Sequence, residues 1–319
     1  MIKYFESKHI LQTNKTLDWF GAEYCANLYR GCSHGCIYCD SRSSCYQDFE
    51  FDIIKPKRNA ISILEDELSR KRKKGIIDTG AMSDPYNPLE VDLKLTRDFL
   101  SLADKYDFGV SITTKGLLIE RDIDLLTSIS MKNPAICELT ITTYQDQLSK
   151  KIEPHAPVSS KRFKTLSTLS NAGLFAGIVL MPVLPFIGDN ENNILEIVKR
   201  AADSGAKFIY PYFGVTLRHN QREYYYNKLD SIFPDMNYLI KYKSVYGESY
   251  ECVVPNHEEL ELLFQEKCNH YGILYRMSDI IREYQTAYDL KQLSLFDFMY
   301  TVNYPYYSNF KPPFPAARF

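Results

Sequence analysis

The chain has 319 residues, of which 45% are hydrophobic and 24% charged, as expected for a soluble globular protein that buries a substantial core. It contains no long apolar run, and its first residues lack a signal-peptide pattern, so the sequence indicates neither a membrane span nor export, and we expect a cytoplasmic protein. The formal net charge of −2 gives no general electrostatic case for nucleic-acid binding.

Three closely spaced cysteines, Cys32, Cys36 and Cys39, follow the first predicted strand, Tyr24 to Tyr29. In a reducing compartment cysteines are ligands or free thiols, and thiolates are the soft ligands that iron-sulfur clusters and zinc select. A four-iron cluster has four irons to ligate, so three cysteines would leave one iron open to a ligand that is not protein. An open metal position is typical of a catalytic site.

The alternative for this loop is a structural zinc site completed by Cys45, Cys25 or His34. Zinc sites usually contain two pairs of Cys or His separated by a dozen or more residues, and the sequence has no second pair. The cluster is therefore the favoured interpretation. The remaining cysteines are isolated and typical of buried small side chains; they are Cys137, Cys252 and Cys268.

From about residue 60 to 213, short apolar runs alternate with amphipathic stretches, a pattern typical of strand-helix units with parallel strands. With the strand before the cysteines, six units predict an α/β fold, an open, partial (β/α)6 barrel. The predicted helices are Ala60 to Lys73, Thr96 to Lys105, Arg121 to Ser130, Ser159 to Asn171 and Glu191 to Ser204. The further predicted strands are Gly75 to Ala81, Phe108 to Thr113, Ile136 to Thr142, Phe175 to Met181 and Lys207 to Phe213.

Polar side chains follow several predicted strands, at the carboxyl ends where functional groups of parallel barrels gather. They provide hydroxyl, carboxylate, ammonium and guanidinium groups, which suit the amine, ribose and carboxylate of an aminoacyl nucleoside. Each also has an ordinary explanation as a turn residue or a surface charge. The candidates are Ser83, Asp84, Lys115, Thr142, Thr143 and Arg162.

After Leu217 the sequence is rich in tyrosine, and we predict a mostly helical extension over residues 216–319 beside a core over residues 1–215. Its aromatic residues lack interleaved basic ones, which favours core packing over base stacking. The last residues, Tyr304 to Pro315, are rich in proline and aromatics and are expected to be extended. The predicted helices are Asn220 to Leu229, Met236 to Lys243 and His257 to His270.

A five-residue peptide near the end of the chain resembles the motif with which bacterial proteins dock on the replicative sliding clamp. The peptide comprises Gln292, Leu293, Ser294, Leu295 and Phe296. Its apolar side chains could fill a pocket on the clamp, with the glutamine as polar anchor. The same side chains could equally pack in the core of the protein itself, so their exposure decides between the two interpretations.

The spacing Cys-x3-Cys-x2-Cys, with Tyr38 before the last cysteine, resembles that of the radical S-adenosylmethionine (radical SAM) enzymes. The resemblance implies a 4Fe-4S cluster whose open iron binds the methionine part of S-adenosylmethionine. It implies that the reduced cluster cleaves this cofactor to a 5'-deoxyadenosyl radical, and that a partner such as flavodoxin or ferredoxin supplies the electron.

Over roughly residues 20–215 the chain resembles the spore photoproduct lyase-like group of that family. The resemblance is carried by Asn27-Leu-Tyr-Arg-Gly-Cys32, Ser83-Asp-Pro-Tyr86, Thr114-Lys115, and Glu153-Pro154 followed by Arg162. It implies that the cofactor contacts Tyr38, Ser83, Asp84 and Lys115, that its ribose meets Thr142 or Thr143, and that Arg162 lies near its carboxylate.

Two positions depart from the lyase that gives the group its name. The lyase donates hydrogen through a cysteine three residues before the Asp of the Ser-Asp pair, assisted by a tyrosine directly after the last cluster cysteine, and these positions are Ala81 and Asp40 here. We therefore expect hydrogen-abstracting or lyase-like chemistry on a nucleic-acid lesion or nucleotide, without that relay. The alternatives are a radical enzyme that acts on a protein or RNA partner, and a non-catalytic, metal-stapled protein that binds nucleic acid or the sliding clamp.

Overall fold

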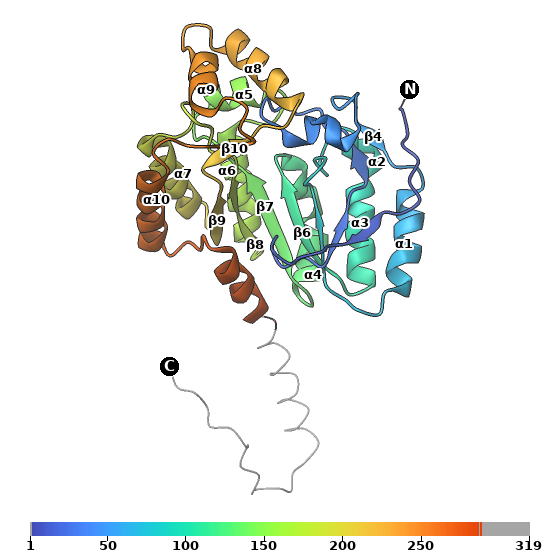
Figure 1. The fold of residues 1–319 in the computed structure, drawn as a ribbon. Helices are drawn as coiled ribbons and strands as arrows, with labels where there is room; N and C mark the ends of the chain where they lie inside the picture. Colours follow the sequence, from blue (N-terminus) through green and yellow to red (C-terminus); the bar gives the residue numbers. More distant parts are fainter. Residues whose placement is uncertain (1, 287, 289–319) are drawn as a thin grey trace, which may run out of the picture.

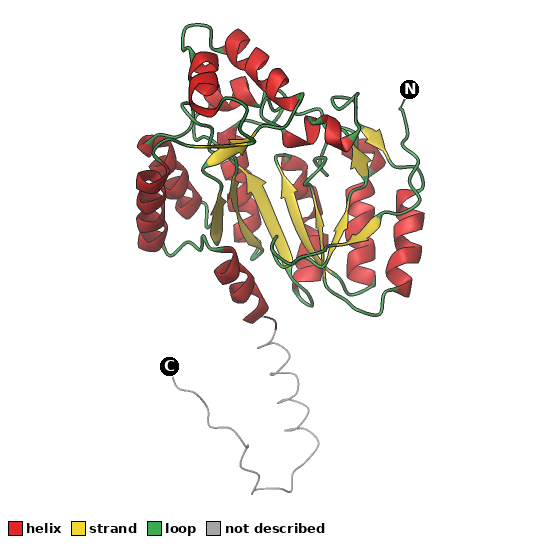
Figure 2. Ribbon diagram, viewed as in Figure 1, coloured by secondary structure: helices red, strands yellow, loops and turns green. Residues whose placement is uncertain are grey.

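The computed structural model describes residues 2–286 and 288 of the chain. Within them, six parallel strands form an open, curved sheet, and helices cover one of its faces (Figures 1 and 2). The predicted partial barrel is confirmed. In sheet order the parallel strands are β2 (Tyr24–Ala26), β5 (Ile76–Thr79), β6 (Gly109–Thr114), β7 (Ala135–Thr140), β8 (Phe175–Leu180) and β9 (Phe208–Pro211).

The helices connect successive strands and bury one apolar face each against the sheet. In α7 the buried positions Ile194, Ile197, Val198 and Ala201 recur at helical spacing, and each large aliphatic side chain contributes about 1.5–3 kcal/mol of burial. The sequence missed α2 and α5, which are short. These helices are α1 (Ala60–Arg70), α2 (Glu90–Leu93), α3 (Leu95–Lys105), α4 (Ile123–Ser130), α5 (Asp146–Ile152), α6 (Ser159–Asn171) and α7 (Glu191–Asp203).

The two faces of the sheet differ in chemistry. Outward residues such as Ile77 and Leu139 join the main core under the helices. Inward residues are apolar near the amino ends of the strands, where Ile76 and Phe208 pack together with Phe20. Farther along the strands the inward side chains become polar, and these polar positions carry the candidate site.

An N-terminal segment closes the lower part of the barrel. Strand β1 (Leu11–Thr13) pairs antiparallel with β2, and the chain then turns so that Trp19 and Phe20 pack against the inner face of the sheet. A helix much later in the chain, over residues 277–286, packs beside them. Its Tyr284 hydroxyl donates to the Phe20 carbonyl at 3.1 Å. The sequence did not predict that these two segments pack together on the inner face of the sheet.

The segment after β9 is mostly helical, as predicted, and covers two parts of the barrel. Helices α8 (Gln221–Ile232) and α9 (Tyr238–Tyr246) pack over the cysteine loop, whereas α10 (His257–Tyr271) packs against α7 (Figure 1). The boundary at residue 215 stays a prediction. The clamp-like peptide and the proline-rich tail lie outside the described residues. None of the described helices is long and apolar enough to cross a membrane.

Short elements frame the cysteine loop. Two antiparallel pairs that the sequence did not predict join distant segments. They are β3 (Tyr29–Arg30) with β4 (Lys55–Pro56), and β10 (Gly214–Thr216) with β11 (Glu251–Val253). The 3-10 helices are η1 (Asp40–Arg42), η2 (Ser44–Tyr46) and η3 (Leu117–Asp122).

Candidate functional site

The cysteine loop lies beyond the carboxyl ends of the strands. Cys32, Cys36 and Cys39 line one cavity of about 90 Å³ and are not in disulfides. The Cys32 N–H donates to the Phe51 carbonyl at 2.8 Å. Gly31 has φ +76°, and a Cβ there would lie 2.3 Å from the Ile53 carbonyl oxygen, so this close approach requires glycine.

The three thiols are chemically suited to a metal cluster. Burial raises the pKa of Cys32 to about 11, and burial also raises the pKa of Cys36 and Cys39. A bound metal cation would hold such thiols as thiolates. No three Cys, His, Asp or Glu side chains of the described residues converge on a single ion, whereas the ligands of different irons in one cluster lie farther apart.

The fourth ligands considered for zinc lie elsewhere or are engaged. Cys45 is exposed and is not part of the cavity wall, and Cys25 lines a different cavity. His34 does line the thiol cavity, but its Nε2 lies 3.0 Å from Asp84 Oδ2. The donor set therefore fits three protein ligands better than four.

Asp84 connects three loops with its two carboxylate oxygens. Its Oδ1 accepts from the Tyr86 N–H at 2.9 Å and the Thr114 hydroxyl at 2.6 Å, and its Oδ2 accepts from the Lys115 N–H at 2.8 Å. Although burial alone would raise its pKa, His34 and these donors hold the pKa of Asp84 well below its usual range. Asp84 thus fixes the positions of its neighbours.

Ser83 and Lys115 take different positions in the thiol cavity. The Ser83 hydroxyl donates to the Gly31 carbonyl and so ties this loop to the cysteine loop. The Lys115 ammonium lies 5.8 Å from the centre of the Tyr38 ring. Burial opposes its charge, but Cys36 and Glu153 outweigh burial and raise the pKa of Lys115. The raised pKa favours the charged form of Lys115 at this cavity.

Tyr38, Glu153 and Arg162 form a buried chain behind the cysteines. The Tyr38 hydroxyl donates to Glu153 Oε1, and Arg162 pairs with Glu153 Oε2. Arg162 is fully buried, and its other nitrogens donate to the Pro157 carbonyl at 2.6 Å and the Thr140 carbonyl at 2.8 Å. All three of its nitrogens have protein acceptors, and the expectation that Arg162 lies near a cofactor carboxylate stays a prediction.

The two threonines after β7 lie outside the wall of the thiol cavity. Thr142 donates to Glu153 at 3.4 Å, Thr143 accepts from the Gln145 N–H at 3.2 Å, and neither lines the thiol cavity. The strand ends at Thr140, and this earlier threonine lines the cavity. Thr140 therefore offers a hydroxyl to this cavity, and the expected contact of Thr142 or Thr143 with a ribose stays a prediction.

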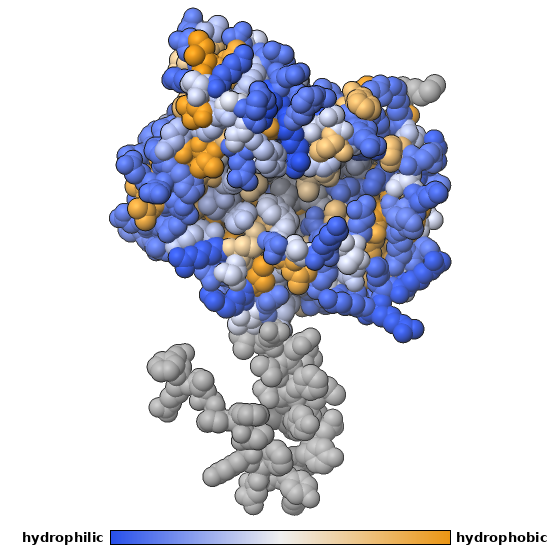
Figure 3. Space-filling model, in the orientation of Figure 1, coloured by the Kyte–Doolittle hydropathy of each residue, from blue (hydrophilic) through white to orange (hydrophobic). Residues whose placement is uncertain are grey.

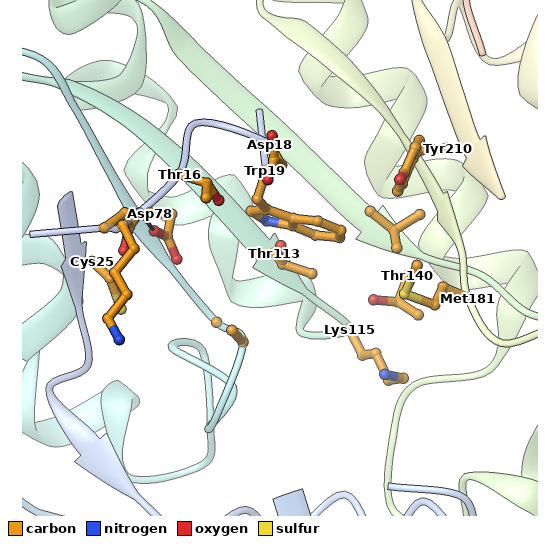
Figure 4. Close-up of a pocket in the computed structure, with 15 residues that line it drawn as sticks. Thr16, Asp18, Trp19, Cys25, Asp78, Thr113, Lys115, Thr140, Met181 and Tyr210 are labelled. Atoms are coloured by element: carbon orange, nitrogen blue, oxygen red, sulfur yellow. Dashed lines mark hydrogen bonds between the residues drawn. The ribbon is translucent and has the colours of Figure 1, made fainter. Parts of the chain in front are cut away.

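A second cavity, of about 710 Å³, lies on the inner face of the barrel next to the first (Figure 4). The face of the molecule seen in Figure 3 is largely hydrophilic, with scattered hydrophobic residues. Gly80 stands between the two cavities with φ +105°, and a Cβ there would lie 1.9 Å from the Thr113 carbonyl oxygen. The residues that line both cavities are Gly80, Ala81, Thr113, Lys115 and Thr140.

A family model described as the radical SAM superfamily matches residues 26–201, which span the cysteine loop and strands β5 to β8. The chain belongs to the radical SAM superfamily. The family implies a 4Fe-4S cluster and S-adenosylmethionine, and the residues of the thiol cavity fit the cluster.

Several proteins are similar to this radical SAM protein. An uncharacterized protein of Methanocaldococcus jannaschii is 30% identical over 254 residues, covering 78% of this chain and 92% of that protein. One of Mycobacterium tuberculosis is 27% identical over 230 residues, covering 70% and 67%. A structure of spore photoproduct lyase complexed with dinucleoside spore photoproduct has a TM-score of 0.62 at 15% identity, covering 85% and 79%, which shows a shared fold.

The two positions that depart from the lyase pattern have different surroundings in this radical SAM protein. Ala81 lines both cavities. Asp40 is held by Arg218, whose Nε donates to its two oxygens at 3.0 and 3.1 Å, and by the Tyr46 hydroxyl at 3.0 Å. Asp40 therefore links the cysteine loop to the extension.

Glu138 is a buried carboxyl group that the sequence pattern did not single out. It is inward on β7 and accepts hydrogen bonds from Ser111 and Thr113, the second of which lines both cavities. Burial raises the pKa of Glu138 to about 8, despite the opposing effect of the two hydroxyl donors. A charged residue type within an otherwise uncharged strand was the available signal.

This raised pKa predicts a pH dependence of stability. Between the ordinary value of 4.5 and about 8, folded Glu138 holds a proton that the unfolded chain releases, so the free energy of unfolding falls as pH rises. The slope reaches up to about 1.4 kcal/mol per pH unit. Urea unfolding at several pH values should show this slope in the wild type and a smaller one in Glu138→Gln. Equal slopes would contradict the assignment.

Proposed function

We propose that this protein cleaves S-adenosylmethionine reductively at a 4Fe-4S cluster held by Cys32, Cys36 and Cys39, and that the resulting 5'-deoxyadenosyl radical abstracts hydrogen from a substrate in the 710 Å³ cavity. The observation that best supports this proposal is that the thiol cavity and the 710 Å³ cavity share part of their walls. A radical generated at the first cavity would reach a molecule in the second without crossing bulk water, which limits side reactions.

The chain's own residues position and charge this site. Lys115 supplies a cation at the shared wall, suited to an anionic group such as a cofactor carboxylate. Asp84 and Ser83 hold Lys115 and the cysteine loop through the hydrogen bonds described above. Thr140 offers a hydroxyl that suits a ribose. Asp84 is thus a positioning residue in this proposal.

The extension keeps the cysteine loop in place. The Gln221 amide on α8 donates to the Tyr38 carbonyl at 3.1 Å, and Gln221 is fully buried. Tyr38 is itself buried beside Cys36, in the cluster of apolar residues shared with α8 and α9. These contacts would exclude water from the cysteine loop, which preserves the reducing power of a cluster.

For the substrate we propose a nucleotide or a nucleic-acid lesion, supported by the fold shared with spore photoproduct lyase. Repair by the lyase relay is not proposed, since Ala81 has no hydrogen atom to donate as a thiol does and Asp40 is engaged with Arg218. The reaction is therefore hydrogen abstraction followed by chemistry that does not use those two positions.

Anaerobic reconstitution tests the proposed function. The protein is loaded with iron and sulfide, reduced, and supplied with S-adenosylmethionine, and 5'-deoxyadenosine is measured by chromatography. We expect about four irons per chain and formation of 5'-deoxyadenosine. Stoichiometric zinc without iron uptake, and no cleavage, would show instead a structural metal site.

We also propose that the peptide Gln292 to Phe296 docks on a bacterial sliding clamp and that flavodoxin or ferredoxin supplies the electron. The clamp peptide offers three apolar side chains and one polar anchor. The full chain should bind purified clamp in a pull-down, and the double variant Leu295→Ala, Phe296→Ala should not. Equal binding of the wild type and the double variant to the clamp would contradict this docking role of the peptide.

A further inference from the structure

A thiol and a carboxylate lie side by side in the wall of the larger cavity. Cys25 on β2 and Asp78 on β5 are direct partners in the parallel register, and both line this cavity (Figure 4). The Asn14 amide donates to Asp78 Oδ1 at 2.9 Å and to the Ala22 carbonyl at 2.9 Å. The N-terminal segment thereby fixes the orientation of the carboxylate.

Asp78 is a buried carboxylate without a counter-charge. Only 6% of its surface is exposed, and burial raises the pKa of Asp78 although the Asn14 amide and the Cys25 thiol oppose this shift. No cationic side chain in the described part of the chain pairs with it. A buried carboxylate is costly unless further donors satisfy it. At a cavity wall, a ligand with N–H groups would supply those donors.

Cys25 differs in position from the other cysteines outside the proposed ligand set. Of the five cysteines outside the proposed ligand set, it alone lines either cavity. Burial and the charge of Asp78 raise its pKa to about 12, so it remains a neutral S–H group at physiological pH. A thiol S–H bond is weaker than most C–H bonds, and a carbon radical therefore removes its hydrogen readily.

The opposite part of the cavity is apolar and aromatic. Trp19 and Tyr210 pack edge to face at 5.7 Å between ring centroids, and Val179 and Met181 lie beside them. A ligand that satisfies both sides has an apolar or planar part and at least one N–H donor. The cavity volume of about 710 Å³ admits a small molecule or a single nucleotide unit.

We propose that Asp78 and Cys25 act together on the substrate in this cavity. Asp78 accepts a hydrogen bond from an N–H group of the substrate, and the Cys25 thiol gives a hydrogen atom to the carbon radical formed from the substrate. This inference rests on the proposed function. In the step, the carbon radical and Cys25 S–H become a C–H bond and a Cys25 thiyl radical. One electron from the low-potential donor of the cluster, with one proton from solvent, restores the thiol.

The first test uses S-adenosylmethionine without substrate, in D2O, with dithionite as reductant and no added thiol. The adenosyl radical then takes hydrogen from the weakest bond within reach. The weak bonds of the two cavity walls that exchange with solvent are the Cys25 S–H and the O–H groups of Tyr38 and Tyr210, and Cys25→Ala removes only the first of them. We expect deuterated 5'-deoxyadenosine from the wild type. The deuterated fraction of the product that Cys25→Ala forms should fall to near background, whereas Cys45→Ala, at an exposed cysteine, should match the wild type.

The outcomes separate this inference from the proposed function. An absence of 5'-deoxyadenosine from the wild type would overturn the proposed function and this inference together. Formation of 5'-deoxyadenosine with the same deuterium content in wild type and Cys25→Ala would leave the function standing and overturn the role of Cys25.

A second test requires no turnover. In the reconstituted full chain, alkylation of Cys25 by iodoacetamide is followed by peptide mass spectrometry. Asp78→Asn removes the charge that raises the thiol pKa, so the rate should rise, about tenfold for each pKa unit lost. Asp18→Asn, in the same cavity wall, should alter the rate much less. Equal rates in wild type and Asp78→Asn would overturn the pairing of Asp78 with Cys25.

Discussion

Replacement of Cys36 by serine should abolish formation of 5'-deoxyadenosine and remove most of the bound iron. Cys36 is buried in the wall of the thiol cavity, and no spare cysteine lines that wall to replace it. Loss of a residue that only hydrogen-bonds to a metal ligand already lowers metal affinity or activity by about 10–100-fold. Loss of a direct ligand should therefore lower the cleavage rate by more than about 100-fold. Iron analysis and the cleavage assay of reconstituted protein measure both effects.

The matched control is Cys45→Ser. Cys45 is exposed and lies outside the cavity wall, so the variant should retain iron and cleavage activity. A four-ligand structural site would instead require a fourth residue, and Cys45 was the candidate cysteine nearest the loop in sequence. Equal damage from Cys36→Ser and Cys45→Ser would therefore favour the structural site over the open cluster.

Replacement of Arg162 by methionine should lower the free energy of unfolding by about 3–5 kcal/mol. Burial alone would raise the pKa of Glu153, but Arg162 and Lys115 hold the pKa of this carboxylate below its usual value. Without the guanidinium, Glu153 would remain in the core without its ion-pair partner, and the Thr140 carbonyl would lose a donor. Urea unfolding of the apo protein followed by circular dichroism measures the loss.

The double variant Arg162→Met, Glu153→Gln separates charge from packing. It removes both members of the buried pair, so no uncompensated charge remains, and it should be more stable than Arg162→Met alone. A double variant that is less stable than either single variant would contradict this account. In that case the hydrogen bonds of the Tyr38-Glu153-Arg162 chain would matter more than its charges.

The barrel could be predicted from the sequence because its signals are local. Helix α6 begins at Ser159 and ends at Asn171 in both prediction and structure, since its amphipathic pattern and its flanking residues lie within one stretch of chain. The cysteine loop is equally local, with three thiols in eight residues. Such features do not depend on how distant segments pack.

The parts of the site that were missed depend on distant contacts. The partners of Arg162 come from three other segments, so its burial could not be read from its place on a helix. The choice among Thr140, Thr142 and Thr143 depends on where β7 ends, and a run of β-branched residues does not mark that end. The pairing of Cys25 with Asp78 joins strands separated by some fifty residues in the sequence.

The most direct test of the open cluster is the electron paramagnetic resonance spectrum of the reduced, reconstituted protein with and without S-adenosylmethionine. Three cysteine ligands leave one iron to bind the added molecule, and a new ligand on an iron changes the g values of the cluster. We predict a reduced 4Fe-4S spectrum that shifts on addition of S-adenosylmethionine. An iron-sulfur spectrum that S-adenosylmethionine leaves unchanged, or no iron-sulfur spectrum at all, would contradict the account.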